Sequence, residues 1–397
     1  MRLLYLAAFI PYPVTDGDKV RAFWTLRALA QRHRVYAFFL DPENRGPRVP
    51  APVRALCADA RVFPLPRSAR ASGALLGALQ GLPVHSFAFW TRQAQAALAQ
   101  AVSRWPVRGC HVHRIRMMPY AERLGLPYVL DATDSIAAYY RRSASLRGWR
   151  RAYARFDVRA VEACERKWGN SAEAVLAITN EERRNLLRLG IRSPVYVAPN
   201  GLDLARWRMS RGRRDPGLLA FVGNLGYPPN VKGLDWFALR IAPAIAARVP
   251  GARLLVAGGG LTPALRASVS RSPLPIRFLG FVSDVRPLLA KASVVVCPLP
   301  LAAGLQNKAV QAMACGAPVV TTSNVARAIG ARRGIEAAVA DSPEGFAAAT
   351  IDLLRDAAHR RRLAAAARRL VAGRFGEKAA RRGIDRAMAV LGRAAGK

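Results

Sequence analysis

The stretch CPLPLAAGLQNKAVQAMACGAPVVTT, residues Cys297–Thr322, decides the fold class that we expect. The apolar run Ala292–Cys297 predicts a buried strand, and it leads into a loop that prolines interrupt. Gly304–Ala314 is predicted as a short helix and Ala317–Thr322 as a second buried strand. A strand, loop, helix and strand in this order are typical of an α/β protein with doubly wound parallel sheets.

The start of this predicted helix has the chemistry of an anion site. Gly304 has no Cβ and allows close approach, Lys308 supplies a cation, and the first N–H groups of a helix lack intrahelical partners. We therefore predict a phosphate site at Gly304, Leu305, Gln306, Asn307 and Lys308. Many α/β helices with a similar start bind no ligand, so the pattern alone leaves a purely structural interpretation open.

The composition is that of a folded protein with two domains. The 397 residues are enough for two domains of ordinary size, and 52% of them are apolar, which excludes broad disorder. The five cysteines are scattered without paired spacing, which favours a reducing cytoplasm over a disulfide framework or a zinc site.

The formal net charge of +37 is extreme, and most of the 62 basic residues are arginines spread over the whole chain. Two compatible interpretations stay open: a solvated basic surface, or attraction to phosphates or anionic lipid.

The amino-terminal stretch MRLLYLAAFIPYPV is interpreted as a buried strand that leads into a loop. A signal peptide is disfavoured because the apolar run is short and no small-residue cleavage site follows it. No apolar stretch reaches the roughly 18 residues needed to span a bilayer.

The amino-terminal half begins as a βαβ unit. We expect a strand over Arg2–Phe9, a loop over Ile10–Lys19, a helix that ends near Ala30, and a strand over Val35–Leu40. Because ligands bind at the carboxyl ends of strands in such folds, Gly17 lies where a substrate would be. No GxGxxG pattern is present, so no nicotinamide site is predicted.

Polar residues follow the later strands of this half. Arg45–Pro66 is predicted to be irregular, and Gly109–His113 to be a strand that places His113 at its carboxyl edge, as a catalytic or a structural histidine. Tyr128–Asp131 is predicted as a further strand. The aspartates in Asp131–Ser135 are interpreted as helix caps and turn formers.

A long helical pattern over Ser135–Trp168 combines an aromatic stripe with many arginines. The basic helix over residues 141–168 is compatible with an anionic membrane surface. A stripe packed on the sheet, with the arginines in water, explains the same pattern.

The second half repeats the βα alternation after a polar connection at Asp203–Pro216. We expect three parts: an amino-terminal Rossmann-like domain over 1–205, a carboxyl-terminal Rossmann-like domain over 206–375, and a final helix over 376–397 that packs back on the first domain. Strands are predicted in the second domain at Leu218–Val222, Arg253–Ala257, Ile276–Leu279, Ser293–Cys297, Pro318–Thr322 and Glu336–Val339.

Five stretches of the chain match the pattern of one family: PYPVTDGDKVR (Pro11–Arg21), PNGLD (Pro199–Asp203), FVGNLGYPPNVKG (Phe221–Gly233), LGFVSDVRPLLAKASVVVCPL (Leu279–Leu299) and GLQNKAVQAMACGAPVV (Gly304–Val320). Through them nearly the whole chain resembles a GT-B glycosyltransferase of the family-4 type (glycosyl transferases group 1), and more narrowly the sugar transferases associated with exosortase/PEP-CTERM exopolysaccharide systems. The resemblance implies two Rossmann-like domains that face each other across a cleft, the first on the acceptor side and the second on the donor side. It also implies transfer of a sugar from a nucleotide diphosphate donor to a glycan or lipid-linked acceptor, with retention and without a metal or other cofactor.

The resemblance also assigns roles to individual residues. The N–H groups near Gly304, Leu305 and Gln306 would hold the diphosphate, with Lys232 as a cation from a facing loop. Gly17 would let the amino-terminal loop approach the donor phosphates. His113 matches a histidine that contacts the donor sugar.

Three positions depart from the family pattern. Family-4 enzymes carry two glutamates separated by seven residues, and the matching positions here are Ala303 and Gln311. Gln311 can still hydrogen-bond a ribose, although without charge, whereas Ala303 cannot bind the donor sugar. The arginine that often follows the first strand of the second domain is Asn224 here.

These departures leave two main hypotheses and one remote alternative. The first is an active transferase of exopolysaccharide or cell-envelope synthesis, cytoplasmic or peripheral at the inner face of the plasma membrane. The second is a catalytically impaired GT-B scaffold that assists a partner transferase. A nucleic-acid binder rests only on the charge, because the arginines are dispersed and no recognition motif is present, so no specific nucleic acid is expected.

Overall fold

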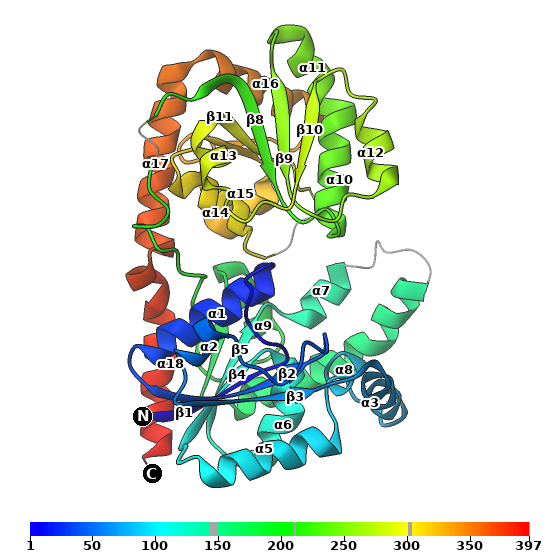
Figure 1. The fold of residues 1–397 in the computed structure, drawn as a ribbon, viewed down its shortest axis with the longest axis vertical. Coiled ribbons are helices and arrows are strands. Elements are labelled where there is room, and N and C mark those ends of the chain that lie inside the picture. Colours follow the sequence, from blue (N-terminus) through cyan, green and yellow to red (C-terminus); the bar gives the residue numbers. More distant parts are fainter. Residues whose placement is uncertain (143–148, 210–211, 301–303, 397) are drawn as a thin grey trace. The chain divides into compact units, whose positions relative to one another are not determined.

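The computed structural model describes residues 1–142, 149–209, 212–300 and 304–396 (Figure 1). Two compact units are present, one formed by Met1–Asn200 with Ala380–Lys397 and the other by Gly201–Ala379. Ala303 and the segment 143–148 of the expected basic helix lie outside the described residues. Within the described ranges, every helix is too short or too polar to span a bilayer.

Unit 1, as we call the first of these, contains a parallel sheet of seven strands in the order β3-β2-β1-β4-β5-β6-β7. Its strands are β1 (Arg2–Ala7), β2 (Arg34–Asp41), β3 (Asp59–Pro64), β4 (Gly109–His113), β5 (Tyr128–Thr133), β6 (Ala174–Ala177) and β7 (Val195–Val197).

The helices of unit 1 lie in the connections between these strands and at the end of the chain. They are α1 (Gly17–Ala30), α2 (Ala51–Arg54), α3 (Arg67–Leu79), α4 (Val84–Phe87), α5 (Arg92–Arg104), η1 (Ile115–Met117), α6 (Met118–Ala121), η2 (Glu122–Leu124), α7 (Ile136–Arg142), α8 (Trp149–Ser171), α9 (Asn180–Arg188) and α18 (Glu377–Ala395), whose first three residues belong to the second unit.

Unit 2 contains a parallel sheet of six strands in the order β10-β9-β8-β11-β12-β13. The strands are β8 (Asp215–Val222), β9 (Arg253–Ala257), β10 (Ile276–Gly280), β11 (Ala292–Cys297), β12 (Val319–Thr321) and β13 (Ala338–Val339). The helices are α10 (Pro228–Trp236), the π-helix η4 (Phe237–Ile241), α11 (Ala242–Arg248), α12 (Pro263–Val269), α13 (Arg286–Lys291), α14 (Asn307–Ala314), α15 (Ser323–Ile329), α16 (Pro343–Arg355) and α17 (Ala357–Phe375).

Each sheet has a hydrophobic core on both faces, because alternate residues of its strands point to opposite sides. In β1, Leu4 and Leu6 belong to one cluster of buried side chains, whereas Leu3 and Tyr5 belong to the other. Continuous apolar runs therefore identify the central strands.

Two sequence-based predictions about local structure are wrong. The segment predicted to be irregular, Arg45–Pro66, contains α2 and the edge strand β3, whose partly exposed residues give no apolar run. The predicted loop Ile10–Lys19 ends earlier than expected, because the Asp16 side chain accepts a hydrogen bond from the Lys19 N–H (3.0 Å) and starts α1 at Gly17.

Within the helical pattern predicted over Ser135–Trp168, the described residues form α7 and α8.

Helix α18 packs against unit 1 through small and apolar side chains. Ala380, Ile384 and Leu391 belong to the same buried cluster as Leu3 and Tyr5. At Gly383 the backbones approach closely, because an added Cβ would lie 2.2 Å from the Val197 carbonyl oxygen.

We expect Gly383→Ala to lower the free energy of unfolding by about 1–3 kcal/mol, because α18 must shift away from β7 to admit the methyl group. Gly392→Ala is the matched control, since nothing lies within 4 Å of its added Cβ, and it is expected to be neutral or stabilising. Urea denaturation of both variants measures the difference. Equal stabilities would contradict the close packing of α18 on β7.

Candidate functional site

In unit 2, side chains from three elements meet at the carboxyl ends of β8 and β11. The Lys308 ammonium, on α14, donates a hydrogen bond to the Asn230 side-chain carbonyl on α10 and lies over the Phe221 ring at 5.2 Å from its centroid. Asn230 in turn donates to the backbone carbonyl of Asn224 (2.7 Å). Gly223 leaves room for this network, because an added Cβ would lie 2.9 Å from Lys308 Nζ.

Lys308 is a cation without a carboxylate partner among the described residues. Burial lowers its pKa to about 8, and the neighbouring Cys297 opposes this shift. An anion that approached the ammonium would restore the charge that burial disfavours.

The predicted helix start is shifted by three residues. Gln306 is the N-cap, its side chain is buried, and α14 begins at Asn307 instead of Gly304. Gly304 has φ +68°, and nothing lies within 4 Å of an added Cβ. Glycine at position 304 therefore allows a left-handed backbone conformation. The half-buried side chain of Leu305 packs against the hydrophobic core of unit 2.

The remaining candidates in unit 2 lie in different places. Gln311 is half-buried on α14, one turn after Lys308, and Asn224 is exposed directly after β8. Lys232 lies on α10, not in a loop as expected, and its side chain is exposed. Because it follows Asn230 by two residues, it points to the opposite side of the helix.

Asn230 was not singled out from the sequence, although it is the residue that connects Asn224 with Lys308. Its position three residues into a helix that begins with two prolines gives no signal of this role. The signal that was available is Lys308, a cation near the start of the predicted helix.

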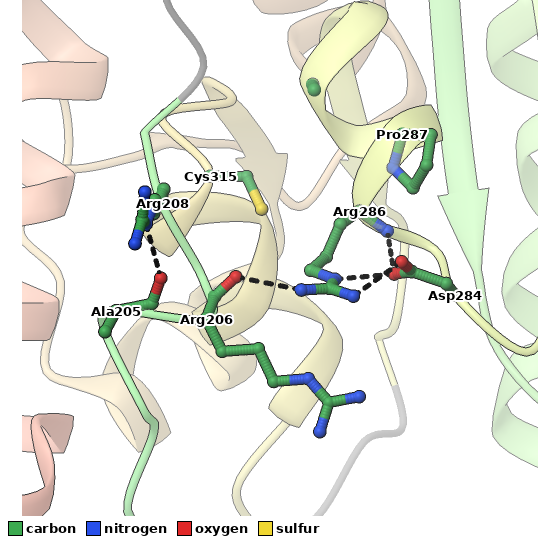
Figure 2. A pocket seen from close by; sticks show the side chains of 8 residues that line it. Ala205, Arg206, Arg208, Asp284, Arg286, Pro287 and Cys315 are labelled. Carbon is green, nitrogen blue, oxygen red and sulfur yellow. Dashed lines mark hydrogen bonds and ion pairs between the residues drawn. The ribbon is translucent and has the colours of Figure 1, made fainter.

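A pocket of about 470 Å³ opens at the other end of α14 (Figure 2). It is lined by Ala205, Arg206, Arg208, Asp284, Arg286, Pro287, Ala290 and Cys315.

Two arginines at or near this pocket, Arg286 and Arg368, already have partners. Arg286 forms a two-pronged ion pair with Asp284 (2.7 Å for each contact), and Arg368 donates to the Ala314 carbonyl (2.6 Å) at the end of α14. The carboxyl end of a helix disfavours anions, so this pocket is less suited to a phosphate than the Lys308 end of α14 is.

In unit 1, a buried ion pair lies beside the carboxyl end of β4. Arg21, on α1, donates to both carboxylate oxygens of Asp131 on β5 (3.0 Å each) and to the Ala198 carbonyl. Although burial opposes ionisation, Arg21 and the two neighbouring histidines hold the pKa of Asp131 far below its ordinary value. Asp131 is therefore a buried charge and not the cap or turn residue that the sequence suggested.

His113 lies opposite Asp131 in the β4–β5 pairing and is fully buried. Its Nδ1 is 3.8 Å from the Asp131 carboxylate, too far for a hydrogen bond, and neither ring nitrogen has a hydrogen-bond partner among the described residues. Burial lowers the pKa of His113, although Asp131 opposes the shift. At neutral pH the ring is uncharged and can donate one hydrogen bond and accept another.

The residues around His113 hold the backbone in an unusual conformation. Arg114 has φ +65°, and its guanidinium contacts Asp134 (2.9 Å) and Asp18 (2.5 Å). Asp18 directly follows Gly17, an exposed residue at the first position of α1. This ion pair ties the start of α1, the end of β4 and the end of β5 together, and sequence patterns gave no indication of it.

Each unit therefore presents one chemically distinct group. Unit 2 offers a desolvated cation beside the N-terminus of an eight-residue helix, an arrangement suited to binding phosphate. Unit 1 offers a neutral, unpartnered imidazole supported by a buried ion pair, an arrangement suited to hydrogen-bonding a hydroxyl group.

Residues 216–356, all within unit 2, match the family described as "Glycosyl transferases group 1". Comparison with curated protein sequences finds no match.

Several solved structures are similar over the whole chain. A sucrose-phosphate synthase from Thermosynechococcus elongatus is 16% identical, with a TM-score of 0.74 over 99% of this chain and 100% of that one. Anabaena HepE in complex with UDP is 16% identical, with a TM-score of 0.68 over 98% and 100%. A trehalose-6-phosphate protein from E. coli bound with UDP-2-fluoro glucose is 14% identical, with a TM-score of 0.67 over 98% and 99%.

With its two doubly wound parallel sheets, the chain has the GT-B fold, and the fold class expected from the sequence is confirmed.

We expect the stability of unit 1 to depend on pH through His111, which stacks on Tyr5 with ring centroids 5.2 Å apart. Burial lowers the pKa of His111 from 6.5 to about 4, so between these values the unfolded chain binds a proton that the folded chain excludes. The free energy of unfolding should fall by on the order of 3 kcal/mol from this group as pH decreases through that window.

Urea titrations at a series of pH values measure this dependence in the wild type and in His111→Leu. The variant should show a shallower dependence, with the remaining slope due in part to His113. An unchanged slope would show that His111 is not responsible.

Proposed function

We propose that the chain is a glycosyltransferase that moves a sugar from a nucleotide diphosphate sugar to an acceptor. The observation that carries the proposal is the buried Lys308 ammonium beside the start of α14, which has no carboxylate partner among the described residues and lies inside the segment that matches the glycosyl transferases group 1 family. The similar structures of Anabaena HepE were obtained in complex with UDP and with UDP-glucose, which favours a nucleotide sugar as the donor.

The chemistry of unit 2 suits the departing diphosphate. Negative charge increases on the diphosphate as the sugar–phosphate bond breaks, so a fixed cation and helix N–H groups stabilise the transition state more than the ground state. In the proposal, Lys308 supplies the cation, and Gly304, Leu305, Gln306 and Asn307 supply the N–H groups. Gly17, Asn224 and Lys232 remain further donor-binding candidates.

His113 supplies the proposed contact to the transferred sugar. A neutral, buried imidazole with unpartnered nitrogens can hydrogen-bond a sugar hydroxyl without competition from water. The Arg21–Asp131 pair lies close enough to fix the local potential, although it does not hydrogen-bond the ring.

The proposal also covers the stereochemistry of the transfer, the acceptor and the place of action. We assign transfer with retention and without a metal or other cofactor, a glycan or lipid-linked acceptor, and a role in exopolysaccharide or cell-envelope synthesis of the exosortase-associated type. The place of action is the cytoplasm or the inner face of the plasma membrane. Arg159, Arg166 and Lys167 are exposed on α8 and favour contact of the basic helix with an anionic membrane.

A second candidate function is a GT-B scaffold that assists a partner transferase. It is favoured by Gln311, which stands where family-4 enzymes carry a glutamate, and by the alanine at position 303. A neutral amide hydrogen-bonds a ribose more weakly than a carboxylate does.

The first test is nucleotide binding. UDP, GDP or ADP at millimolar concentration should raise the melting temperature of the wild type, and Lys308→Gln should weaken the affinity roughly tenfold or more. Lys291→Gln is the matched control, an exposed lysine of unit 2 at the opposite end of β11, and should bind like the wild type.

The pH dependence of nucleotide affinity provides a further test of the role of Lys308. Nucleotide affinity of the wild type should decline as pH rises above about 8, because Lys308 loses its proton, and Lys308→Gln should lack this decline. If none of the three nucleotides shifts the melting temperature, the transferase proposal fails.

The second test separates the enzyme from the scaffold. With a panel of nucleotide sugars and detection of released nucleotide, Gln311→Glu should release nucleotide faster than the wild type with the preferred donor, by about tenfold if a charged hydrogen bond to the ribose forms. His113→Ala should abolish release in both backgrounds. An inactive wild type whose Gln311→Glu variant also stays inactive, while both bind nucleotide, would favour the scaffold.

A further inference from the structure

Helix α3 packs on unit 1 through two glycines. Gly73 and Gly77 are one turn apart and both are buried. An added Cβ would lie 2.3 Å from the Phe87 carbonyl oxygen at Gly73 and 2.8 Å from the Phe87 Cβ at Gly77. The inner face of α3 is therefore held by close backbone approach to α4 and not by large apolar side chains.

Two large apolar side chains of α3 point outward instead. Leu75 is 62% exposed and Leu79 is 77% exposed, the highest value for a large apolar side chain among the described residues. Each follows one of the two glycines by two positions, which places it about 200° around the helix from the packed face. A surface helix of a water-facing protein shows the reverse arrangement.

A cation stands at the start of the same row of side chains. Arg67, Ala71, Leu75 and Leu79 follow one another at spacings of four and all are exposed, so they form one row, which we call the α3 ridge. The small side chain of Ala71 separates the arginine from the two leucines. A ridge with a cation at one end and leucines at the other matches an interface that has phosphates outside and hydrocarbon inside.

The chain around the α3 ridge is cationic and has no acidic residue of its own. Residues 60–121 contain no aspartate and no glutamate, whereas arginines recur throughout this range. Two of these arginines, Arg67 and Arg70, belong to α3 itself. Local charge therefore favours an anionic surface as the partner of the ridge.

The support beneath the ridge is firm. The Asp157 carboxylate on α8 accepts from the Val84 N–H at the start of α4 (2.8 Å), and Arg116 donates to His85 (3.0 Å). The guanidinium of Arg70, on the flank of α3, lies 5.0 Å from the centroid of the Phe89 ring. The first two contacts fix α4, on which α3 packs, and the third holds α3 itself at the edge of unit 1 (Figure 1).

We propose that the α3 ridge docks on an anionic lipid bilayer, with Leu75 and Leu79 in the acyl boundary and Arg67 on a lipid phosphate. The net charge of +37 favours an anionic surface and opposes a second copy, which carries the same charge. The inference rests on the part of the proposed function that places the acceptor at a membrane, and it adds a second surface to the basic helix α8.

The test is partition of the full chain onto vesicles of equal parts phosphatidylglycerol and phosphatidylcholine, measured by co-sedimentation. The wild type should bind these vesicles and not pure phosphatidylcholine. The double variant Leu75→Gln/Leu79→Gln should lower the partition coefficient by at least about tenfold, and Arg67→Gln by about fivefold in low salt. Hydrogen exchange in residues 67–79 should slow on the anionic vesicles.

The matched controls lie on α9 of the same unit. Leu187 is a 40% exposed leucine and Arg184 is an exposed arginine of that helix. Leu187→Gln and Arg184→Gln should each partition like the wild type, and all variants should keep the wild-type melting temperature. Partition of the leucine double variant within twofold of the wild type would overturn the proposal. So would loss of self-association in sedimentation velocity without loss of vesicle binding.

Nucleotide binding, measured by the melting-temperature shift, keeps this inference separate from the transferase proposal. A wild type that binds UDP and ignores anionic vesicles overturns the docking surface alone. A wild type that binds vesicles through the α3 ridge and no nucleotide overturns the transferase alone.

Discussion

The buried ion pair between Arg21 and Asp131 is the interaction on which the arrangement of unit 1 depends. Neither side chain reaches water, and each charge is stable there only because the other is present in a two-pronged geometry. The pair joins α1 to β5, and the third contact of Arg21, to the Ala198 carbonyl, extends it beyond β7. His113 therefore lies beside a fixed negative charge without a hydrogen bond to it, and neither of its ring nitrogens has a partner among the described residues.

The central charge of unit 2, the Lys308 ammonium, has no carboxylate partner among the described residues, in contrast to Arg21 in unit 1. Lys308 contacts an amide oxygen and an aromatic face, both of which stabilise an ammonium less than a carboxylate does. The partners are strong enough to position the side chain and too weak to neutralise it. A carboxylate in the place of Asn230 would hold Lys308 more tightly, and it would also compete with any phosphate. The choice of asparagine therefore favours a site for an external anion over a structural ion pair.

The sequence predicted the secondary-structure elements that depend on local patterns of residues. Apolar runs located the central strands within three residues at each end, and without any shift in the case of Gly109–His113. The phosphate site at the start of α14 stays a prediction. Contacts between residues far apart in the sequence were not predictable. Arg21 and Asp131 are 110 positions apart. Asp131 was interpreted as a helix cap because it precedes other residues that commonly cap helices. The edge strand β3 was missed because half-exposed strands carry mixed residues. The glycines of α3 looked like weak helix formers, and only the contact with Phe87 explains them.

The use of the acidic residues explains how a chain with so many arginines presents a cationic exterior. Several of its carboxylates face inward: Asp131 neutralises Arg21, and Asp157 and Glu165 cap the starts of α4 and α7, with burial raising the pKa of Glu165 to about 7. With 62 lysines and arginines against 25 aspartates and glutamates, most basic residues lack an acidic counter-charge. The resulting field is long-ranged and not selective, so it attracts phosphates and anionic surfaces alike. Selectivity must then come from short-range features, and in our proposals these are the Lys308 network for a small anion and the exposed leucines of α3 for an extended anionic surface.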